Sequence, residues 1–186
     1  MQDLSLHILD IVENSLTAGA KKVEIRIGED ISQDRLTIEI IDDGQGMDAE
    51  MQAKALDPFF TTKTTRRVGL GLPLFKETCE ICQGHFLLES HPGKGTKIKA
   101  IFPYAHIDRK PLGNLGETLL ALIVGHPDVD IYYEHKRDGI KFSLDTKEIR
   151  AILEDVPLND PGVVSFLRTY IFSQLAELGL DKEYII

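Results

Sequence analysis

The stretch 40–47 constrains the fold of this chain more than any other segment. The residues 36–40 before it alternate between apolar and polar side chains, which is typical of a half-buried strand. This strand runs into Asp42 and Asp43 and then into a turn with two glycines. Glycine lets a ligand approach the backbone, and an ionised carboxylate accepts hydrogen bonds, for example from the exocyclic amine of adenine. By itself, the pattern is also compatible with an ordinary tight turn.

Composition excludes several classes of protein. The chain has 186 residues, of which 42% are hydrophobic, and this is typical of a globular protein with one domain and room for a smaller appendage. The net charge of −9 comes without a basic stripe, so we expect no nucleic-acid partner. No apolar run approaches the roughly 20 residues that span a bilayer, and no secretory signal is recognised. We therefore expect a cytoplasmic protein that is not bound to a membrane.

The two cysteines, Cys79 and Cys82, have a C-x-x-C spacing. A metal site would need further ligands, for which His85 and His91 are the nearby candidates. Haem attachment would need a histidine directly after the second cysteine, where Gln83 stands. We expect both thiols on a helix as small core or partly exposed residues, and their role stays open.

The first helix is predicted by a mainly apolar stripe at helical spacing, which consists of Leu4, Ile8, Ile11, Val12, Ser15 and Leu16. A second, polar stripe is formed by His7, Asp10, Asn14 and Thr17. Aspartate and asparagine are poor helix formers, so their presence inside a helix needs a reason, and one such reason is the binding of a metal and water. An asparagine oxygen can coordinate Mg²⁺, and a carboxylate one turn earlier could act as a general base. The alternative is a solvated helix face.

Apolar periodicity and the positions of glycines also predict the elements that follow the first helix. Glycines at 69 and 71 lead into a helix, and the free N–H groups of such a helix start bind anions. The loop before it, residues 57–67, is rich in hydroxyl groups and is expected to be mobile. The predicted strands are 22–27, 36–41, 86–89 and 96–102, and the predicted helices are 49–55 and 73–82.

Five motifs in this order resemble the GHKL (Bergerat-fold) ATPase superfamily of histidine kinases, type II topoisomerases, mismatch-repair ATPases and a heat-shock chaperone. They cover about residues 4–103, and the part from Val68 to Phe102 is most similar to the histidine kinases. The motifs are Asn14, Asp42-x-Gly44-x-Gly46, Asp57-Pro-Phe-Phe60, Gly69-Leu-Gly71-Leu and Gly95-Thr96.

The resemblance implies an ATP site with Mg²⁺. It implies that Asn14 holds the metal, that Asp10 is the general base and that Asp42 pairs with adenine, with Thr96 beside it. Aspartate is one methylene shorter than the family's usual glutamate, so we expect slow hydrolysis. Lys63 is the expected lid lysine, with Arg66 and Arg67 as competitors. The other nucleotide-binding residues that it implies are Gly44, Gly46, Met47, Phe60, Gly69, Leu70, Gly71 and Leu72.

Few residues precede the first motif, so we expect that the helical hairpin with the phospho-accepting histidine of kinases is absent. His7 is not in that context and is interpreted as a solvated residue or as one that supports the site. A kinase of this kind would act on another molecule.

Residues 105–186 match none of these motifs and are expected to form a small α/β unit. Its predicted elements are a helix 114–124, a hairpin 129–144 with Asp138-Gly139 at its turn, a helix 146–153 capped by Thr146, and a helix 161–178. We expect this unit to bind a partner or to form a homodimer, with stabilisation of the fold as the alternative.

The complete expectation is an α/β (α+β) sandwich with a mixed, largely antiparallel sheet and helices on one face. Residues 1–104 are predicted to be a histidine-kinase-like ATP-binding domain and residues 105–186 a second domain. The predicted function is a Mg·ATP-dependent protein kinase or ATPase that acts in trans on a signalling partner. The alternative is a nucleotide-gated binding module that regulates its partner without turnover.

Overall fold

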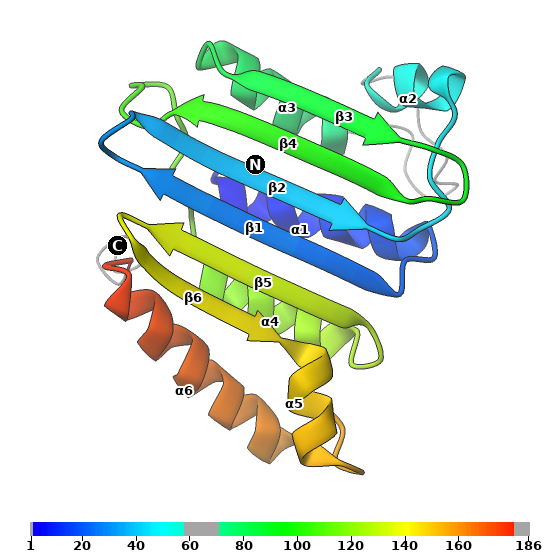
Figure 1. Ribbon diagram of the computed structural model, residues 1–186, viewed down its shortest axis with the longest axis vertical. Coiled ribbons are helices and arrows are strands. Elements are labelled where there is room, and N and C mark those ends of the chain that lie inside the picture. Colours follow the sequence, from blue (N-terminus) through cyan, green and yellow to red (C-terminus); the bar gives the residue numbers. More distant parts are fainter. Residues whose placement is uncertain (1, 58–70, 181–186) are drawn as a thin grey trace.

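A computed structural model describes residues 2–57 and 71–180, and these form one six-stranded sheet in the order β3-β4-β2-β1-β5-β6 (Figure 1). Neighbouring strands are antiparallel except β1 and β5, which are parallel. The prediction of a mixed, largely antiparallel sheet is thereby confirmed. The strands are β1 (Lys22–Asp30), β2 (Arg35–Asp42), β3 (His85–Ser90), β4 (Thr96–Pro103), β5 (Asp130–Arg137) and β6 (Ile140–Asp145).

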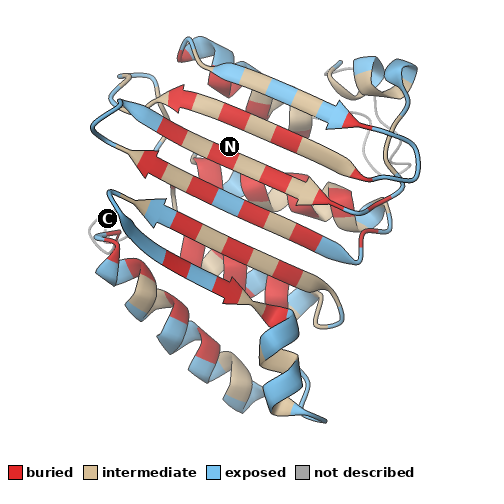
Figure 2. Cartoon of the chain, in the orientation of Figure 1, coloured by how far each residue is buried: buried red, intermediate tan, exposed pale blue. Residues whose placement is uncertain are grey.

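The three helices α1, α3 and α4 lie against the same face of this sheet (Figure 1). Buried and more exposed residues alternate along the strands (Figure 2), so the covered face carries the core. Most charged residues of β1, β2 and β5 are at the alternate positions, on the other face. The short helix α2 follows β2, and α5 and α6 lie beyond β6. The helices are α1 (Leu4–Thr17), α2 (Ala49–Ala55), α3 (Gly71–Ile81), α4 (Leu115–Gly125), α5 (Thr146–Leu153) and α6 (Pro161–Glu177).

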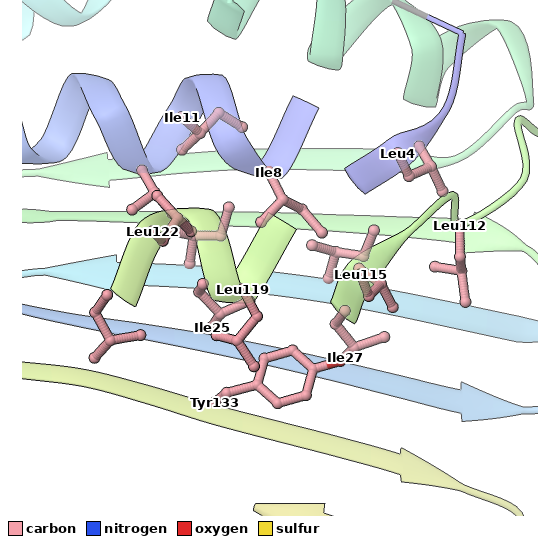
Figure 3. Close-up of a cluster of buried hydrophobic side chains, with 14 of the residues drawn as sticks. Leu4, Ile8, Ile11, Ile25, Ile27, Leu112, Leu115, Leu119, Leu122 and Tyr133 are labelled. Atoms are coloured by element: carbon pink, nitrogen blue, oxygen red, sulfur yellow. The ribbon is translucent and has the colours of Figure 1, made fainter. Parts of the chain in front are cut away.

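The core joins the N-terminal and C-terminal parts of the chain. In Figure 3, Ile8 and Ile11 of α1 lie near Leu119 and Leu122 of α4, with Tyr133 of β5 beside them. All these side chains are almost fully buried. The apolar stripe that predicted the first helix therefore packs against residues more than 100 positions away.

Residues after 104 continue the same sheet. The whole of β5 pairs with β1, from Lys22 opposite Asp130 to Glu29 opposite Arg137. The N–H of Leu4 also donates to the carbonyl of Pro111, at 2.9 Å. The division into domains 1–104 and 105–186 remains a prediction. Because the two parts share one sheet, it can be tested by measuring whether they unfold separately.

One cap differs from the sequence prediction. The N-cap of α5 is Asp145, whose Oδ1 accepts a hydrogen bond from the N–H of Lys147, whereas Thr146 was expected to cap the helix. Thr146 is instead fully buried, and its hydroxyl accepts from the N–H of Ile131 and donates to the carbonyl of Val129. The threonine thus ties the start of α5 to β5, a contact that depends on tertiary packing.

Candidate active site

The polar stripe of α1 faces the first turn of α3. A Cβ atom added to Gly71 would overlap Oδ2 of Asp10 and would lie 3.0 Å from Nδ2 of Asn14. The backbone of α3 therefore begins directly against these two side chains. Both are partly buried, so they remain accessible from one side. Leu72, the next residue, is also partly buried and packs against the core.

This corner has the properties of a magnesium site. Its two side chains, Asp10 and Asn14, offer carboxylate and amide oxygens, which are hard ligands that Mg²⁺ accepts. In this arrangement both side chains approach the backbone of α3 closely because residue 71 is a glycine. Mg²⁺ is usually held by one or two protein groups together with substrate phosphates, so the residues present fit this ion.

Near the C-terminal end of α1, directly after Asn14, Ser15 is one of three donors that hold the Asp42 carboxylate. Ser15 Oγ donates to Asp42 Oδ2 at 2.6 Å, and the N–H groups of Gly44 and Thr96 donate to Oδ1 at 2.9 and 3.2 Å. The Asp42 residue is 7% exposed. A buried carboxylate with donors on both oxygens has a fixed orientation, and its remaining lone pairs can only accept.

Two glycines bring the loop after Asp42 close to the turn between β3 and β4. Gly46 has φ of +67°, and a Cβ there would overlap the carbonyl oxygen of His91. Gly95 has φ of +81°, and a Cβ there would overlap the carbonyl oxygen of Asp42. Only glycine fits this close approach of two backbones at positive φ. The turn signal in the sequence thus corresponds to a contact between distant segments.

Sequence reasoning missed two serines of this site, Ser15 and Ser90. Ser15 was assigned to the apolar stripe, yet its hydroxyl contacts Asp42. Ser90 Oγ accepts from the N–H of Met47 at 2.8 Å, donates to the carbonyl of Gly95 at 2.9 Å and lies 3.0 Å from Thr96 Oγ1. No local pattern predicts the contact of Ser15 with Asp42, because the two residues are 27 positions apart. The position of Ser90 depends on strand register.

A cavity of about 440 Å³ lies where β2 and β3 end and β4 begins. Its lining includes Asp42, Ser90 and Thr96, together with Lys97 and Glu89. By strand alternation, the last two belong to the open face of the sheet. The cavity therefore extends from the Asp42 end of the site around the edge of the sheet.

His7 is fully buried, which corrects its interpretation as a solvated residue. Its Nε2 atom lies 3.4 Å from Thr78 Oγ1 and 3.4 Å from Lys110 Nζ, and Nδ1 has no hydrogen-bond partner within the described residues. Burial and the nearby Lys110 lower the pKa of His7 from 6.5 to about 4. A neutral, enclosed imidazole is not accessible to a phosphoryl donor.

Four expected site residues lie outside the described residues: Phe60, Lys63, Gly69 and Leu70. The competing lid residues Arg66 and Arg67 do so as well. The described ones form two groups, with Asp10, Asn14, Gly71 and Leu72 at the start of α3, and Asp42, Gly44, Gly46, Met47 and Thr96 at the end of β2.

The cysteines are both free and buried, and burial raises the pKa of Cys79 to about 11. Cys79 Sγ donates to the carbonyl of Ile101. In the described part of the chain, no three histidine, cysteine or acidic side chains gather as a metal site. None of the helices described there is long and apolar enough to cross a membrane.

Comparison with known proteins shows similarity to one family over the first part of the chain. The model of the family described as "Histidine kinase-, DNA gyrase B-, and HSP90-like ATPase" matches residues 2–106. The signal transduction histidine-protein kinase AtoS of Escherichia coli is 37% identical over 97 residues, which are 52% of this chain and 16% of that protein. The sensor protein kinase FleS of Pseudomonas aeruginosa is 36% identical over 110 residues, which are 59% of this chain and 27% of that protein.

The chain thus matches less than a third of the length of these curated relatives. Among solved structures, the N-terminal domain of a DNA repair protein is similar, with a TM-score of 0.50 and 16% sequence identity. The match covers 78% of this chain and 53% of that one, and it concerns the fold alone.

Proposed function

The chain belongs to the family of histidine kinase-, DNA gyrase B- and HSP90-like ATPases and contains an ATP-binding domain of the histidine-kinase-like type, and we propose that it binds Mg·ATP and transfers the γ-phosphoryl group to a partner protein. The observation that carries this proposal is the contact of Asp10 and Asn14 with the start of α3. It brings an acid, an amide and the first turn of α3 to one place, and the N-terminal turn of a helix favours bound anions.

In this proposal, the phosphate end of the nucleotide lies at the start of α3. The N–H groups of Gly71 and Leu72 at the start of α3 would bind phosphate oxygens, and Asn14 would hold Mg²⁺. The bound Mg²⁺ would neutralise charge on the phosphates. Asp10, one turn before Asn14, accepts a proton from the attacking hydroxyl, imidazole or water. Its reach is shorter than that of glutamate, so transfer to water is expected to be slow.

The adenine end lies at Asp42. Its carboxylate accepts a hydrogen bond from the exocyclic amine, while Ser15 and the N–H groups of Gly44 and Thr96 keep it oriented. The two ends lie along one rigid helix, because Asn14 and Ser15 are consecutive in α1. With a rise of about 1.5 Å per residue, Asp10 lies roughly 7 Å from Ser15 along the helix axis, on its N-terminal side.

The phosphoryl acceptor is proposed to be in another molecule. His7 of α1 has no exposed surface, so we do not assign it as the acceptor. We assign binding of the partner, or of a second copy of this chain, to residues 105–186. We also place the protein in the cytoplasm, where ATP is available.

The experiment combines γ-labelled ATP, the purified chain and candidate partner proteins. Label on a protein supports the proposed kinase, whereas release of free phosphate indicates an ATPase. Asp10→Asn should lower phosphoryl transfer by about 10²–10⁴-fold and leave ATP affinity almost unchanged. Asp42→Asn should instead weaken ATP binding, because it replaces an acceptor that faces adenine by an amide.

Two outcomes would contradict the proposal. Nucleotide binding without labelled protein or released phosphate would indicate a regulatory binding module. An Asp10→Asn variant that loses affinity and turnover equally would show that Asp10 is a binding residue and not the base.

A further inference from the structure

The hydroxyl of Ser90 has three partners in a closed environment. Ser90 is 3% exposed, and its Oγ lies 2.8 Å from the N of Met47, 2.9 Å from the O of Gly95 and 3.0 Å from Thr96 Oγ1. A serine hydroxyl has one proton to donate and two lone pairs to accept with. The three partners therefore use its complete hydrogen-bonding capacity.

The direction of each bond follows from this count. The carbonyl of Gly95 can only accept, so it takes the single proton of Ser90. The N–H of Met47 can only donate, so it takes one lone pair. The second lone pair remains for Thr96, whose hydroxyl must donate its proton to Ser90 Oγ. Thr96 Oγ1 then has no proton left and presents only lone pairs to other groups.

This acceptor lies beside a second one. In the sheet register, Asp42 is opposite Thr96 and Thr96 is opposite Ser90, so the three residues form a row across β2, β4 and β3. All three line the cavity at these strand ends. Asp42 is an acceptor because it is a carboxylate, and Thr96 is one because Ser90 takes its proton. The row therefore presents two neighbouring acceptors to a ligand.

We propose that Ser90 is a positioning residue that determines base specificity, because it keeps the Thr96 hydroxyl an acceptor. In this proposal both acceptors face the substituent at position 6 of the base, where they match an amino group, which is a donor, and repel a carbonyl oxygen, which is an acceptor. A purine with a 6-amino group is thus preferred to one with a 6-oxo group. This inference rests on the proposed binding of ATP, and it concerns a residue that need not touch the nucleotide.

The test compares the dissociation constants of Mg·ATP and Mg·ITP, which differ in the base at position 6 and in the proton on N1. Ser90→Ala frees the Thr96 hydroxyl to turn and donate. The ratio of the ITP constant to the ATP constant should then fall by about tenfold, as expected for one redirected hydrogen bond. Ser90→Thr keeps a hydroxyl and should restore most of the ratio. Ser5→Ala is the matched control, because Ser5 is 2% exposed and donates to Asp3 Oδ1 away from the cavity.

A double-mutant cycle separates this role from a merely structural one. Thr96→Val removes the acceptor itself and should lower the ratio as Ser90→Ala does. In the Thr96→Val background, Ser90→Ala should cause no further decrease. Thr96→Ser retains the hydroxyl and should preserve the ratio. If Ser90→Ala does not fold, the two Thr96 variants still decide whether an acceptor at this position sets the preference.

Several results would overturn the inference while the proposed function stands. These are equal binding of ATP and ITP by the unmodified chain, an unchanged ratio in Ser90→Ala or in Thr96→Val, or an equal decrease in Ser5→Ala. If the unmodified chain binds neither nucleotide, the proposed function fails, and the inference that rests on it fails as well.

Discussion

At the residue scale, burial decides what each polar side chain of α1 can do. His7, Asp10 and Asn14 belong to one stripe in the sequence, but His7 is fully buried while the other two are partly accessible. The imidazole packs against the ring of Phe75, with 5.5 Å between ring centroids. The same stripe thus supplies a site at its C-terminal end and a neutral core residue at its N-terminal end.

The first prediction concerns His7 and pH. Because its pKa is lowered to about 4 in the folded protein, the unfolded chain, with a pKa near 6.5, binds more protons between these values. The free energy of unfolding should therefore decrease as the pH falls from about 6.5 to about 4, by up to about 3 kcal/mol from this residue. Urea unfolding across this range measures the decrease.

Variants isolate the contribution of His7. His7→Gln removes the titrating group, so its unfolding free energy should depend less on pH than that of the unmodified chain. His85→Gln is the control, because His85 is exposed on β3. An identical pH dependence in His7→Gln and in the unmodified chain would refute the assignment.

At the element scale, the contact between α1 and the start of α3 defines the phosphate end. Gly71 is a helical residue that lies against Asp10 and Asn14 because it lacks a Cβ. The overlapping atom would be the end of a flexible carboxylate side chain, which can move. The glycine is therefore needed more for the shape of the site than for the fold.

The second prediction is that Gly71→Ala weakens Mg·ATP binding by about tenfold or more, while the melting temperature changes little. The added methyl group would lie 3.0 Å from Nδ2 of Asn14, the proposed ligand of Mg²⁺, at the proposed position of the phosphates. A displacement of about 1 Å in such a site is costly. Calorimetric titration with Mg·ATP measures the loss. Gly125→Ala, at the end of α4, is the control, because a Cβ there meets nothing within 4 Å. Unchanged affinity in Gly71→Ala would contradict the placement of phosphate at this corner.

At the scale of the whole molecule, β5 and β6 extend the sheet of the ATP-binding part. A buried network crosses the junction, since Glu29 Oε1 of β1 lies 2.7 Å from His135 Nε2 of β5 and His135 Nδ1 lies 2.9 Å from the hydroxyl of Tyr133. Burial alone would raise the pKa of Glu29, but the hydrogen bond from His135 and the nearby positive charges outweigh it, and the net pKa is lowered. Separating the two parts would leave this carboxylate without its partner.

The third prediction tests whether residues 1–104 and 105–186 unfold separately. Ile131 is fully buried in β5 and lies opposite Val23 of β1. Ile131→Ala should cost about 2–5 kcal/mol through the cavity it leaves. If the sheet unfolds as one unit, hydrogen exchange of the β2 amides should accelerate as much as that of the β5 amides. Faster exchange in β5 alone would support two independent domains.

The sequence by itself determined the elements and the family of this protein. Periodicity, caps and turns act over a few residues, so α2 (Ala49–Ala55) was predicted with its observed limits and the ends of the other elements within a few residues. The motifs around Asn14, Asp42 and Gly71 led to the family that the comparison shows.

Tertiary structure alone decided the burial of His7, the contacts of Ser15 and Ser90, and the parallel pairing of β5 with β1. Each of these depends on which distant segment packs against a residue and in which register. Local patterns do not encode such partners, because the same serine or histidine has the same helical or strand periodicity whether its neighbour is water, a carboxylate or a phenylalanine ring.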